Sequence, residues 1–264
     1  MECRMDGRTA LVTGASMGLG LAMAREFAKS GANVALVARR ADVLAEAKAS
    51  IEAESAVKSG VKVGTYVCDV SDPAAIAAAH DAAAQELGPI DVLVNNAGSS
   101  HRGAFLDVSD EIWRADLELK LFGAIRLTRL VFPGMIERRW GRIINILNVG
   151  AKAPPATGAP TVVSRAAGMA LTKVLAGEGA PHNVLVNALL VGKIVSDQIA
   201  RRHANLETNQ SLDEYIAESG GIVPMGRMGT AAEFANMACF LASDAGSYIT
   251  GTAINVDGGL CPVV

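Results

Sequence analysis

Short runs of β-branched residues alternate along the chain with longer segments whose apolar residues recur at helical spacing. This alternation is typical of crossover units that build a parallel sheet. It predicts strands near 8–13, 33–38, 61–67, 91–95, 142–147, 183–189 and 253–256. It predicts helices near 18–30, 41–59, 73–87, 110–138, 161–179 and 230–242. We therefore expect an α/β fold, with a doubly wound seven-stranded parallel sheet and a single domain over 1–264.

One segment, 193–224, interrupts the alternation. It is polar and contains Gly220, Gly221 and Pro224. A polar connection of this length favours a mobile lid over a substrate site. A surface insertion without a role is the alternative.

Composition narrows the class of protein. The chain has 264 residues, half of them apolar, which is enough for one large core. Its net charge is −3 and its basic residues are scattered, so no nucleic-acid surface is expected. No apolar run is long enough to cross a bilayer, and the first strand begins too early for a signal peptide. The four cysteines lack metal or disulfide spacing. We expect a cytoplasmic protein without a metal or a membrane anchor.

The strongest chemical signal is the stretch 13–20, TGASMGLG, between the first strand and the first helix. Glycines there let the backbone turn sharply and let a pyrophosphate approach without a Cβ in the way. The helix N-terminus offers unpaired N–H groups and partial positive charge. A lone glycine motif is weak evidence, but the strand before it and the helix after it favour a dinucleotide site.

Four motifs together resemble the short-chain dehydrogenase/reductase family, in its group related to 3-oxoacyl-carrier-protein reductases. They are the GxxxGxG spacing at 14–20, Asp69 in VCDVSD, Asn95-Asn96-Ala97-Gly98, and the tail from Phe240 to Gly259. The resemblance spans nearly the whole chain. It implies a Rossmann-like fold, a nicotinamide cofactor, a small-molecule substrate and a homodimer or homotetramer.

The resemblance also implies cofactor contacts. They are Gly14, Ser16, Met17, Gly18, Leu19 and Gly20 at the pyrophosphate and ribose, Asp69 and Val70 at the adenine, Asn96, Ala97 and Gly98 at the ribose, and the Ile194 backbone at the nicotinamide. The family's usual Pro-Gly before this last contact is Val191-Gly192 here.

The end of the second strand bears on the choice of cofactor. An acidic residue there would bind a ribose 2′-hydroxyl and repel a 2′-phosphate. The chain instead has Ala38 followed by Arg39 and Arg40. A guanidinium group favours a phosphate, so we expect NADP(H) in preference to NAD(H). The alternative is that both arginines are solvated surface charges.

The catalytic positions depart from the family pattern. The family places Asn, Ser, Tyr and Lys around the reacting carbonyl. The matching positions here are Lys120, Asn148, Thr161 and Arg165. A threonine hydroxyl is a poor general acid, because it is much less acidic and shorter than a phenol. Arg165 would still hold the nicotinamide ribose, and Asn148 would still polarise a carbonyl.

Lys120 has two interpretations. A lysine in the cleft beside Arg165 would have a lowered pKa and would carry the proton. Alternatively, it snorkels and simply fills the vacated space near the subunit surface. His101 is a further candidate proton donor, although a lone loop histidine is more often solvated. Lys152 and Lys193 are weaker candidates.

The substrate side is less defined. Arg201, Arg202 and His203 would meet an anionic group of the substrate or form an exposed basic turn. The small apolar residues of 151–160 favour a hydrophobic substrate over a sugar.

Three functions follow. The leading hypothesis is an oxidoreductase that interconverts a ketone and a secondary alcohol, such as a 3-oxoacyl or cyclic substrate, with an altered proton donor. The second is a non-redox lyase or isomerase with Lys120 as base or nucleophile. The third is a cofactor-binding subunit without activity.

Overall fold

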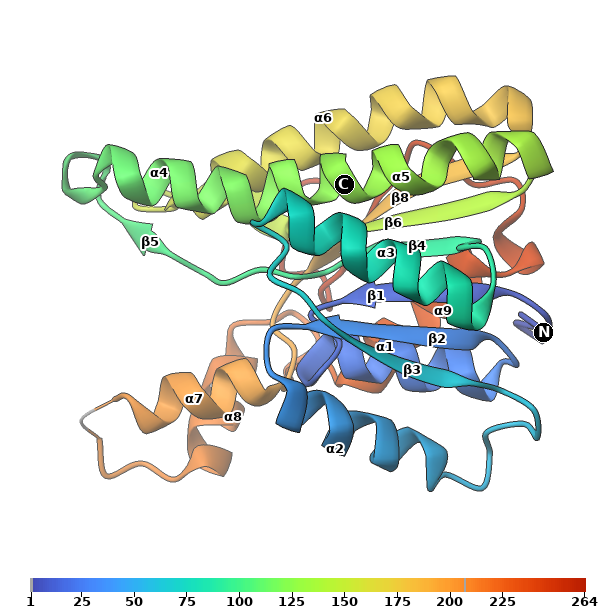
Figure 1. Ribbon diagram of the computed structural model, residues 1–264. Coiled ribbons are helices and arrows are strands. Elements are labelled where there is room, and N and C mark those ends of the chain that lie inside the picture. Colours follow the sequence, from blue (N-terminus) through green and yellow to red (C-terminus); the bar gives the residue numbers. More distant parts are fainter. Residues whose placement is uncertain (1, 207) are drawn as a thin grey trace.

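A seven-stranded parallel sheet organises the chain (Figure 1). The computed structural model describes residues 2–206 and 208–264, without the side chains of 197, 198, 201 and 202. The strands are β1 (Thr9–Thr13), β2 (Asn33–Ala38), β3 (Val63–Val67), β4 (Val92–Asn95), β6 (Gly141–Asn148), β8 (Val184–Val191) and β9 (Ala253–Val256). Every predicted strand is confirmed.

The strand order is β3-β2-β1-β4-β6-β8-β9, and all pairs are parallel. The chain winds outward from β1 to β3 and then returns to β4 on the other side of β1. Ligand crevices open at the carboxyl ends of the strands where the winding reverses. The sheet therefore places a binding site at the ends of β1 and β4.

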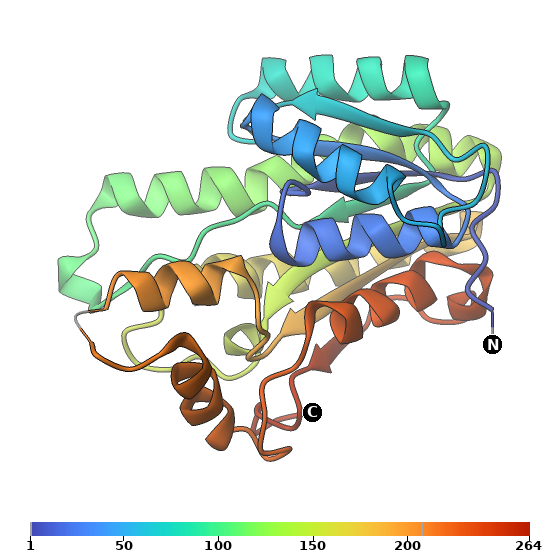
Figure 2. The same cartoon turned by 90° about the horizontal axis from the view of Figure 1, so that it is seen from below.

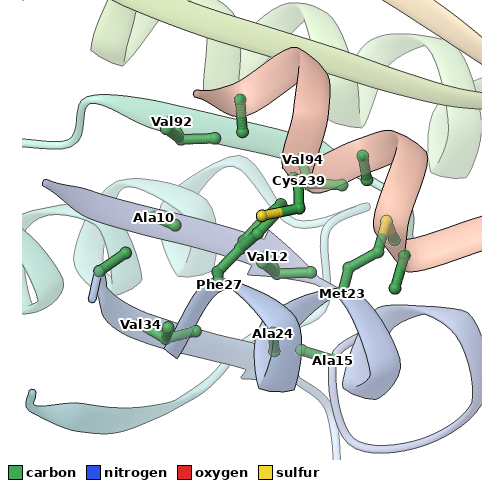
Figure 3. Close-up of a cluster of buried hydrophobic side chains, with 14 of the residues drawn as sticks. Ala10, Val12, Ala15, Met23, Ala24, Phe27, Val34, Val92, Val94 and Cys239 are labelled. Carbon is green, nitrogen blue, oxygen red and sulfur yellow. The ribbon is translucent and has the colours of Figure 1, made fainter. Parts of the chain in front are cut away.

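Helices cover both faces of the sheet, as the alternation predicts. The first face carries α1 (Gly18–Lys29), α2 (Ala41–Glu52) and α9 (Ala231–Ala242), and the second carries α3 (Pro73–Leu87), α5 (Gly123–Arg138) and α6 (Thr161–Gly179) (Figure 2). Figure 3 shows Phe27 of α1 and Cys239 of α9 among the buried side chains that pack near Val12 of β1. Burial of these apolar faces drives the layers together.

Two predicted helices differ in detail. The second was expected to reach residue 59, but α2 ends at Glu52, because the sequence that follows is rich in Ser and Gly and forms turns. The helix predicted over 110–138 is continuous but consists of α4 (Asp110–Leu117), a π-helical turn η2 (Glu118–Phe122) and α5. Such a turn is rare and is often found at functional sites.

The segment 193–224 contains two helices, α7 (Asp197–Ala204) and α8 (Leu212–Gly221). In Figure 1 they project from the sheet on the side away from the N-terminus. A two-stranded antiparallel ribbon of β5 (Arg102–Gly103) and β7 (Ala159–Pro160) was not predicted, because two-residue strands carry no periodicity.

Short 3₁₀ turns complete the chain: η1 (Phe105–Asp107), η3 (Val149–Ala151), η4 (Ala180–His182) and η5 (Asp244–Gly246). Within the described residues, no helix has the length and apolar character that crossing a bilayer would require.

Candidate active site

The glycine turn between β1 and α1 has the backbone geometry that its sequence predicts. Gly14 and Gly18 have φ values of 62° and 58°, a region that other residues rarely adopt. A Cβ on Gly20 would lie 2.2 Å from the Gly14 carbonyl oxygen, so α1 can start here only without a side chain at that position. Ser16, Met17 and Leu19 lie between these glycines, partly exposed.

Asn96 and Thr13 fix this turn against the end of β4. The Asn96 side chain donates to the carbonyl oxygens of Thr13 at 2.8 Å and Gly14 at 3.2 Å. The Thr13 hydroxyl accepts from the backbone N–H groups of Asn96 and Ala97, both at 2.9 Å. The segment that begins at Asn96 is therefore held against the turn, and it continues through Ala97 to the exposed Gly98.

The other end of the crevice lies beyond β2 and β3. Arg39 is exposed directly after β2, and Asp69 follows β3. Hydrogen bonds from the Ser71 hydroxyl and N–H are the main cause of the lowered pKa of Asp69, and the charge of Arg39 adds to them. Val70 is buried beside Asp69. An exposed arginine thus lies directly after β2, at the strand end that the sequence analysis links to the choice of dinucleotide.

Ile194 lies at the start of the lid and is buried. Ile194 lies opposite Gly229 in an isolated parallel bridge. Its two hydrogen bonds run from the N–H of Val195 to the Gly229 carbonyl oxygen and from the N–H of Gly229 to the Lys193 carbonyl oxygen. The bridge therefore leaves the N–H and C=O of Ile194 itself out of its hydrogen bonds. Gly192 has no room for a Cβ, which would lie 2.5 Å from Cα of Asp257.

A cavity of about 390 Å³ lies between the first turns of α1 and the beginning of the segment 193–224. It is lined by residues that include Gly18, Arg25, Ser196 and Ala231. Its volume is within the range of small-molecule sites. Three lining residues, Val195, Ser196 and Ala200, belong to the segment 193–224, whose role as a lid stays a prediction.

Lys120 and Thr161 are both buried and in contact. The Lys120 Nζ atom donates to the Thr161 hydroxyl at 2.9 Å and forms an ion pair with Asp116. The exposed fraction of the Lys120 side chain is 1%. Snorkelling to the surface, one of the two interpretations, is therefore wrong.

Burial is the main cause that lowers the pKa of Lys120, as the other interpretation expected. Its hydrogen bond to Asp116 opposes the shift, and the charges of Arg165 and Arg102 add to it. The cavity beside the Lys120 side chain has a volume of about 10 Å³, which is about the size of one water molecule.

Arg165 lies one helical turn after Thr161 on α6. One Nη donates to the carbonyl oxygen of Ile146, while Nε is buried with no hydrogen-bond partner among the described residues. Burial lowers the pKa of Arg165 to about 10, so the group stays charged at neutral pH. A Cβ on Gly98 would lie 2.6 Å from Nη2, so this glycine makes room for the guanidinium group.

Asn148 is the last residue of β6, so it lies at the carboxyl edge of the sheet, where β1 and β4 also end. Its Oδ1 atom is buried and has no partner within the described part of the chain. Buried polar atoms without partners are costly and call for an explanation such as a bound ligand. Asn148 and Arg165 both retain such atoms, whereas Lys120 and Thr161 are paired.

The remaining candidates lie around the rim. His101 is exposed, and Lys152 is partly exposed after η3. Lys193 is partly exposed and interacts with other groups. His203 binds the carbonyl oxygen of Gln210 at 2.8 Å and packs on Tyr215. The side chains of Arg201 and Arg202 lie outside the described residues.

Sequence reasoning missed Asp116 and Ser164. The Asp116 carboxylate binds Lys120 through Oδ1 and the Ser164 hydroxyl through Oδ2, the latter at 2.6 Å. The signal was present, because Asp116 precedes Lys120 by four residues and Ser164 follows Thr161 by three. Residues at these spacings share one face of a helix.

Comparisons with known proteins agree with this geometry. A family model described as Enoyl-(Acyl carrier protein) reductase matches residues 14–261. The chain belongs to the short-chain dehydrogenase/reductase family. The oxidoreductase UcpA of Escherichia coli K12 is 37% identical over 260 residues, covering 97% of this chain and 95% of that protein.

Solved structures in this family superpose over the whole fold. L-sorbose reductase from Gluconobacter frateurii, complexed with NADPH and L-sorbose, has a TM-score of 0.93 at 33% identity and covers 100% of both chains. A short-chain oxidoreductase from Pseudomonas aeruginosa PAO1 that contains an atypical catalytic centre has a TM-score of 0.91 at 32% identity. The match covers 99% of this chain and 100% of that one.

Membership settles the general activity. The protein is a nicotinamide-dependent oxidoreductase of the short-chain dehydrogenase/reductase family. The fold and the family expected from the motifs are confirmed. The roles of the individual site residues, the substrate and the preferred dinucleotide remain predictions.

Proposed function

We propose that the protein is an NADPH-dependent reductase that converts a ketone to a secondary alcohol, and that also catalyses the reverse reaction. The observation that carries the proposal is the crevice itself. At one end the turn between β1 and α1 depends on glycines at 14, 18 and 20. At the other end Oδ1 of Asn148 and Nε of Arg165 are buried without a partner among the described residues.

These residues fit a nicotinamide dinucleotide, which would supply the hydride when bound. The glycine turn and the first N–H groups of α1 would hold the pyrophosphate. Asn96, Ala97 and Gly98 would border the ribose. The N–H and C=O of Ile194, which the bridge to Gly229 does not use, would bind the carboxamide. Arg165 would donate to the nicotinamide ribose hydroxyls, because its guanidinium carries several N–H groups in one plane.

The preference for NADPH rests on Arg39. This side chain is exposed where the adenosine ribose would lie, and no acidic residue stands at Ala38. An arginine at this point offers a charge-assisted fork to a 2′-phosphate. The relative L-sorbose reductase was solved with NADPH, which supports the same preference here.

Asn148 is proposed to hold the substrate oxygen. Its Nδ2 group would donate to the oxygen on which negative charge develops, and the buried Oδ1 atom would accept from an N–H or O–H group of the bound ligand. The geometry does not favour Lys120 as a nucleophile that forms an imine, because the amine is buried and paired with Asp116. A carbonyl group would have to break that ion pair before it could react.

The protein is proposed to be a cytoplasmic homo-oligomer. Val163 and Val174 of α6 are exposed by 48% and 58%. The small residues Ala166, Ala167, Gly168 and Ala170 on the same helix permit a second helix to approach closely. Light scattering of the purified protein would distinguish a dimer or tetramer from a monomer.

The test of the proposed function is direct. The purified protein is incubated with NADPH or NADH and a panel of a cyclic ketone, a 3-oxoacyl thioester and a ketose, and the absorbance of the reduced nicotinamide is followed. We expect oxidation of NADPH with at least one ketone and weaker use of NADH. Dinucleotide binding by calorimetry without turnover of any ketone would contradict the proposal and indicate an inactive subunit.

A further inference from the structure

Thr161 is the residue that the family resemblance aligns with the catalytic tyrosine, and the hydrogen-bonding capacity of its hydroxyl is fully used. It donates to the carbonyl oxygen of His101 at 2.6 Å. It accepts from the N–H of His101 at 3.1 Å and from Nζ of Lys120 at 2.9 Å. A hydroxyl has one hydrogen and two lone pairs, so none remains for a substrate oxygen.

The Asp116 carboxylate binds both Lys120 and Ser164, which lie next to the Thr161 hydroxyl or its backbone. One carboxylate oxygen pairs with Lys120 and lies 3.4 Å from the Thr161 hydroxyl, and the other accepts from Ser164 at 2.6 Å. The Ser164 hydroxyl also lies 3.0 Å from the Thr161 carbonyl oxygen. We name Asp116, Lys120, Thr161 and Ser164 the clasp.

The Thr161 hydroxyl of the clasp is hydrogen-bonded to the backbone of one residue outside it, His101. Both the N–H and the C=O of His101 bind the same hydroxyl, which fixes this peptide against the start of α6. Directly after it, Arg102 pairs with Pro160 in the short ribbon. His101 is exposed, follows Gly98 by three residues and contacts Thr161 through its backbone, so its side chain starts beside this tetrad position.

We propose that the clasp is a positioning device and that the imidazole of His101 carries the proton to the substrate oxygen. This inference rests on the proposed reduction of a ketone. It gives the residues at two family catalytic positions, Lys120 and Thr161, a role in orientation. The reactive group then comes from the loop that they hold.

The proton transfer balances as follows. When the carbonyl carbon accepts hydride from a reduced nicotinamide, the electron pair of the C=O double bond moves to the oxygen. An N–H bond of the His101 imidazolium breaks and an O–H bond forms on that oxygen. The imidazole is left neutral and takes a new proton from solvent, to which it is exposed. Imidazole is suited to this exchange near neutral pH.

The charged groups around this loop are mostly cations. Arg102 follows on β5, Lys120 and Asp116 lie behind Thr161, and Arg165 lies one turn further along α6. Asp116 is already engaged by Lys120 and Ser164. The surplus positive charge would stabilise the oxygen while negative charge develops on it.

The first experiment tests the clasp without cofactor or substrate. Amide hydrogen exchange is measured over 99–104 in wild type, Thr161→Val and Thr161→Ser. We expect faster exchange in Thr161→Val, because the hydroxyl that binds His101 is lost, and nearly wild-type exchange in Thr161→Ser, which keeps it. Equal protection in all three proteins would overturn the positioning role.

The second experiment tests the proton donor. His101→Gln is compared with His182→Gln, a matched change of a partly exposed histidine in η4. We expect His101→Gln to lower kcat about 10²–10⁴-fold, the usual value of a positioned acid or base. Its dissociation constant for NADPH, measured by calorimetry, should stay within about twofold, since only the proton transfer is removed. Added imidazole should restore part of the rate.

The outcomes separate the inference from the proposed function. Ketone turnover in wild type with an unchanged rate in His101→Gln would overturn the proton donor and leave the reductase standing. No turnover in wild type would overturn the reductase and, with it, the proton donor. The exchange measurement tests the positioning role in either case.

Discussion

Asp116→Leu is the most informative single change, because it leaves the Lys120 ammonium group buried without a partner. The exposed fractions of the two side chains are 1% for Lys120 and 4% for Asp116. Removing one member of a buried ion pair typically costs about 3–5 kcal/mol, since the remaining charge stays desolvated. For a chain of this size that corresponds to a fall in Tm of about 6–20 °C.

Removing both charges should lower the free energy of unfolding much less than the sum of the losses in the two single variants. In Asp116→Leu/Lys120→Met no charge remains buried, and the loss is limited to hydrogen bonds to Thr161 and Ser164. At about 0.5–1.5 kcal/mol for each bond, the double variant should lose about 1–3 kcal/mol. The difference is the coupling energy of the pair.

The assay is urea unfolding of the wild type, both single variants and the double variant, with Asp110→Leu as a matched control. Asp110 lies on the same helix and also pairs with a cation, but its side chain is 79% exposed. Exposed pairs contribute little, so this control should be close to wild type. A loss below about 1 kcal/mol in Asp116→Leu, or additive losses in the double variant, would refute the reasoning.

The same variant predicts a dependence on pH. Burial holds the pKa of Lys120 below its ordinary value of 10.5. Asp116 opposes that shift, so its removal enlarges it. The unfolded chain then keeps this proton to higher pH than the folded chain, and the free energy of unfolding rises with pH between the lowered pKa and 10.5. A profile of Asp116→Leu that lacks this rise, or a double variant that shows it, would contradict the assignment.

The other predictions concern the crevice. Gly20→Ala should abolish dinucleotide binding in calorimetry, because its Cβ would lie 2.2 Å from a carbonyl oxygen, whereas Gly177→Ala, with nothing within 4 Å, should bind normally. Arg39→Gln should raise the KM for NADPH by about tenfold, the effect of a charge-assisted contact worth about 1.4 kcal/mol. The KM for NADH should be unchanged in Arg39→Gln. Arg40→Gln serves as the control, and equal effects of Arg39→Gln and Arg40→Gln on the KM for NADPH would count against a contact of Arg39 with the 2′-phosphate. Asn148→Ala should raise the free energy of unfolding by about 1 kcal/mol, since it removes a buried acceptor that has no partner among the described residues. It should also lower kcat with the ketone. A stable variant with full activity would exclude a role of Asn148 in catalysis.

The sequence predicted the backbone geometry of the glycine turn better than the pairing of the side chains around Lys120, for a physical reason. Gly14, Gly18 and Gly20 report backbone requirements that any nucleotide turn imposes, so the residue type alone indicates the geometry. The state of Lys120 depends on which carboxylate lies beside it. The spacing of four residues makes Asp116 a possible partner, but only the structure shows that both side chains are buried together.

The loop that bears His101 shows the same limit. A two-residue strand has no periodicity, so nothing in the sequence pairs Arg102 with Pro160. The bonds of the Thr161 hydroxyl to His101 likewise join segments far apart in the chain. The sequence could name these residues as candidates, but only the folded arrangement shows which of them is already paired.

The π-helical turn at Glu118–Phe122 makes the number of residues in this helix as important as their identity. Gly123, just beyond it, lies so close to Val70 that a Cβ would be 2.9 Å from the Val70 carbonyl oxygen, which anchors the downstream helix. Deleting one residue between Asp116 and Gly123 would rotate the upstream helix by about 100° and carry the carboxylate away from its partners. Relatives that differ here by a single-residue insertion or deletion should therefore lack this ion pair even when they retain a lysine. Aligned length across the turn is thus a criterion for recognising other members built in the same way.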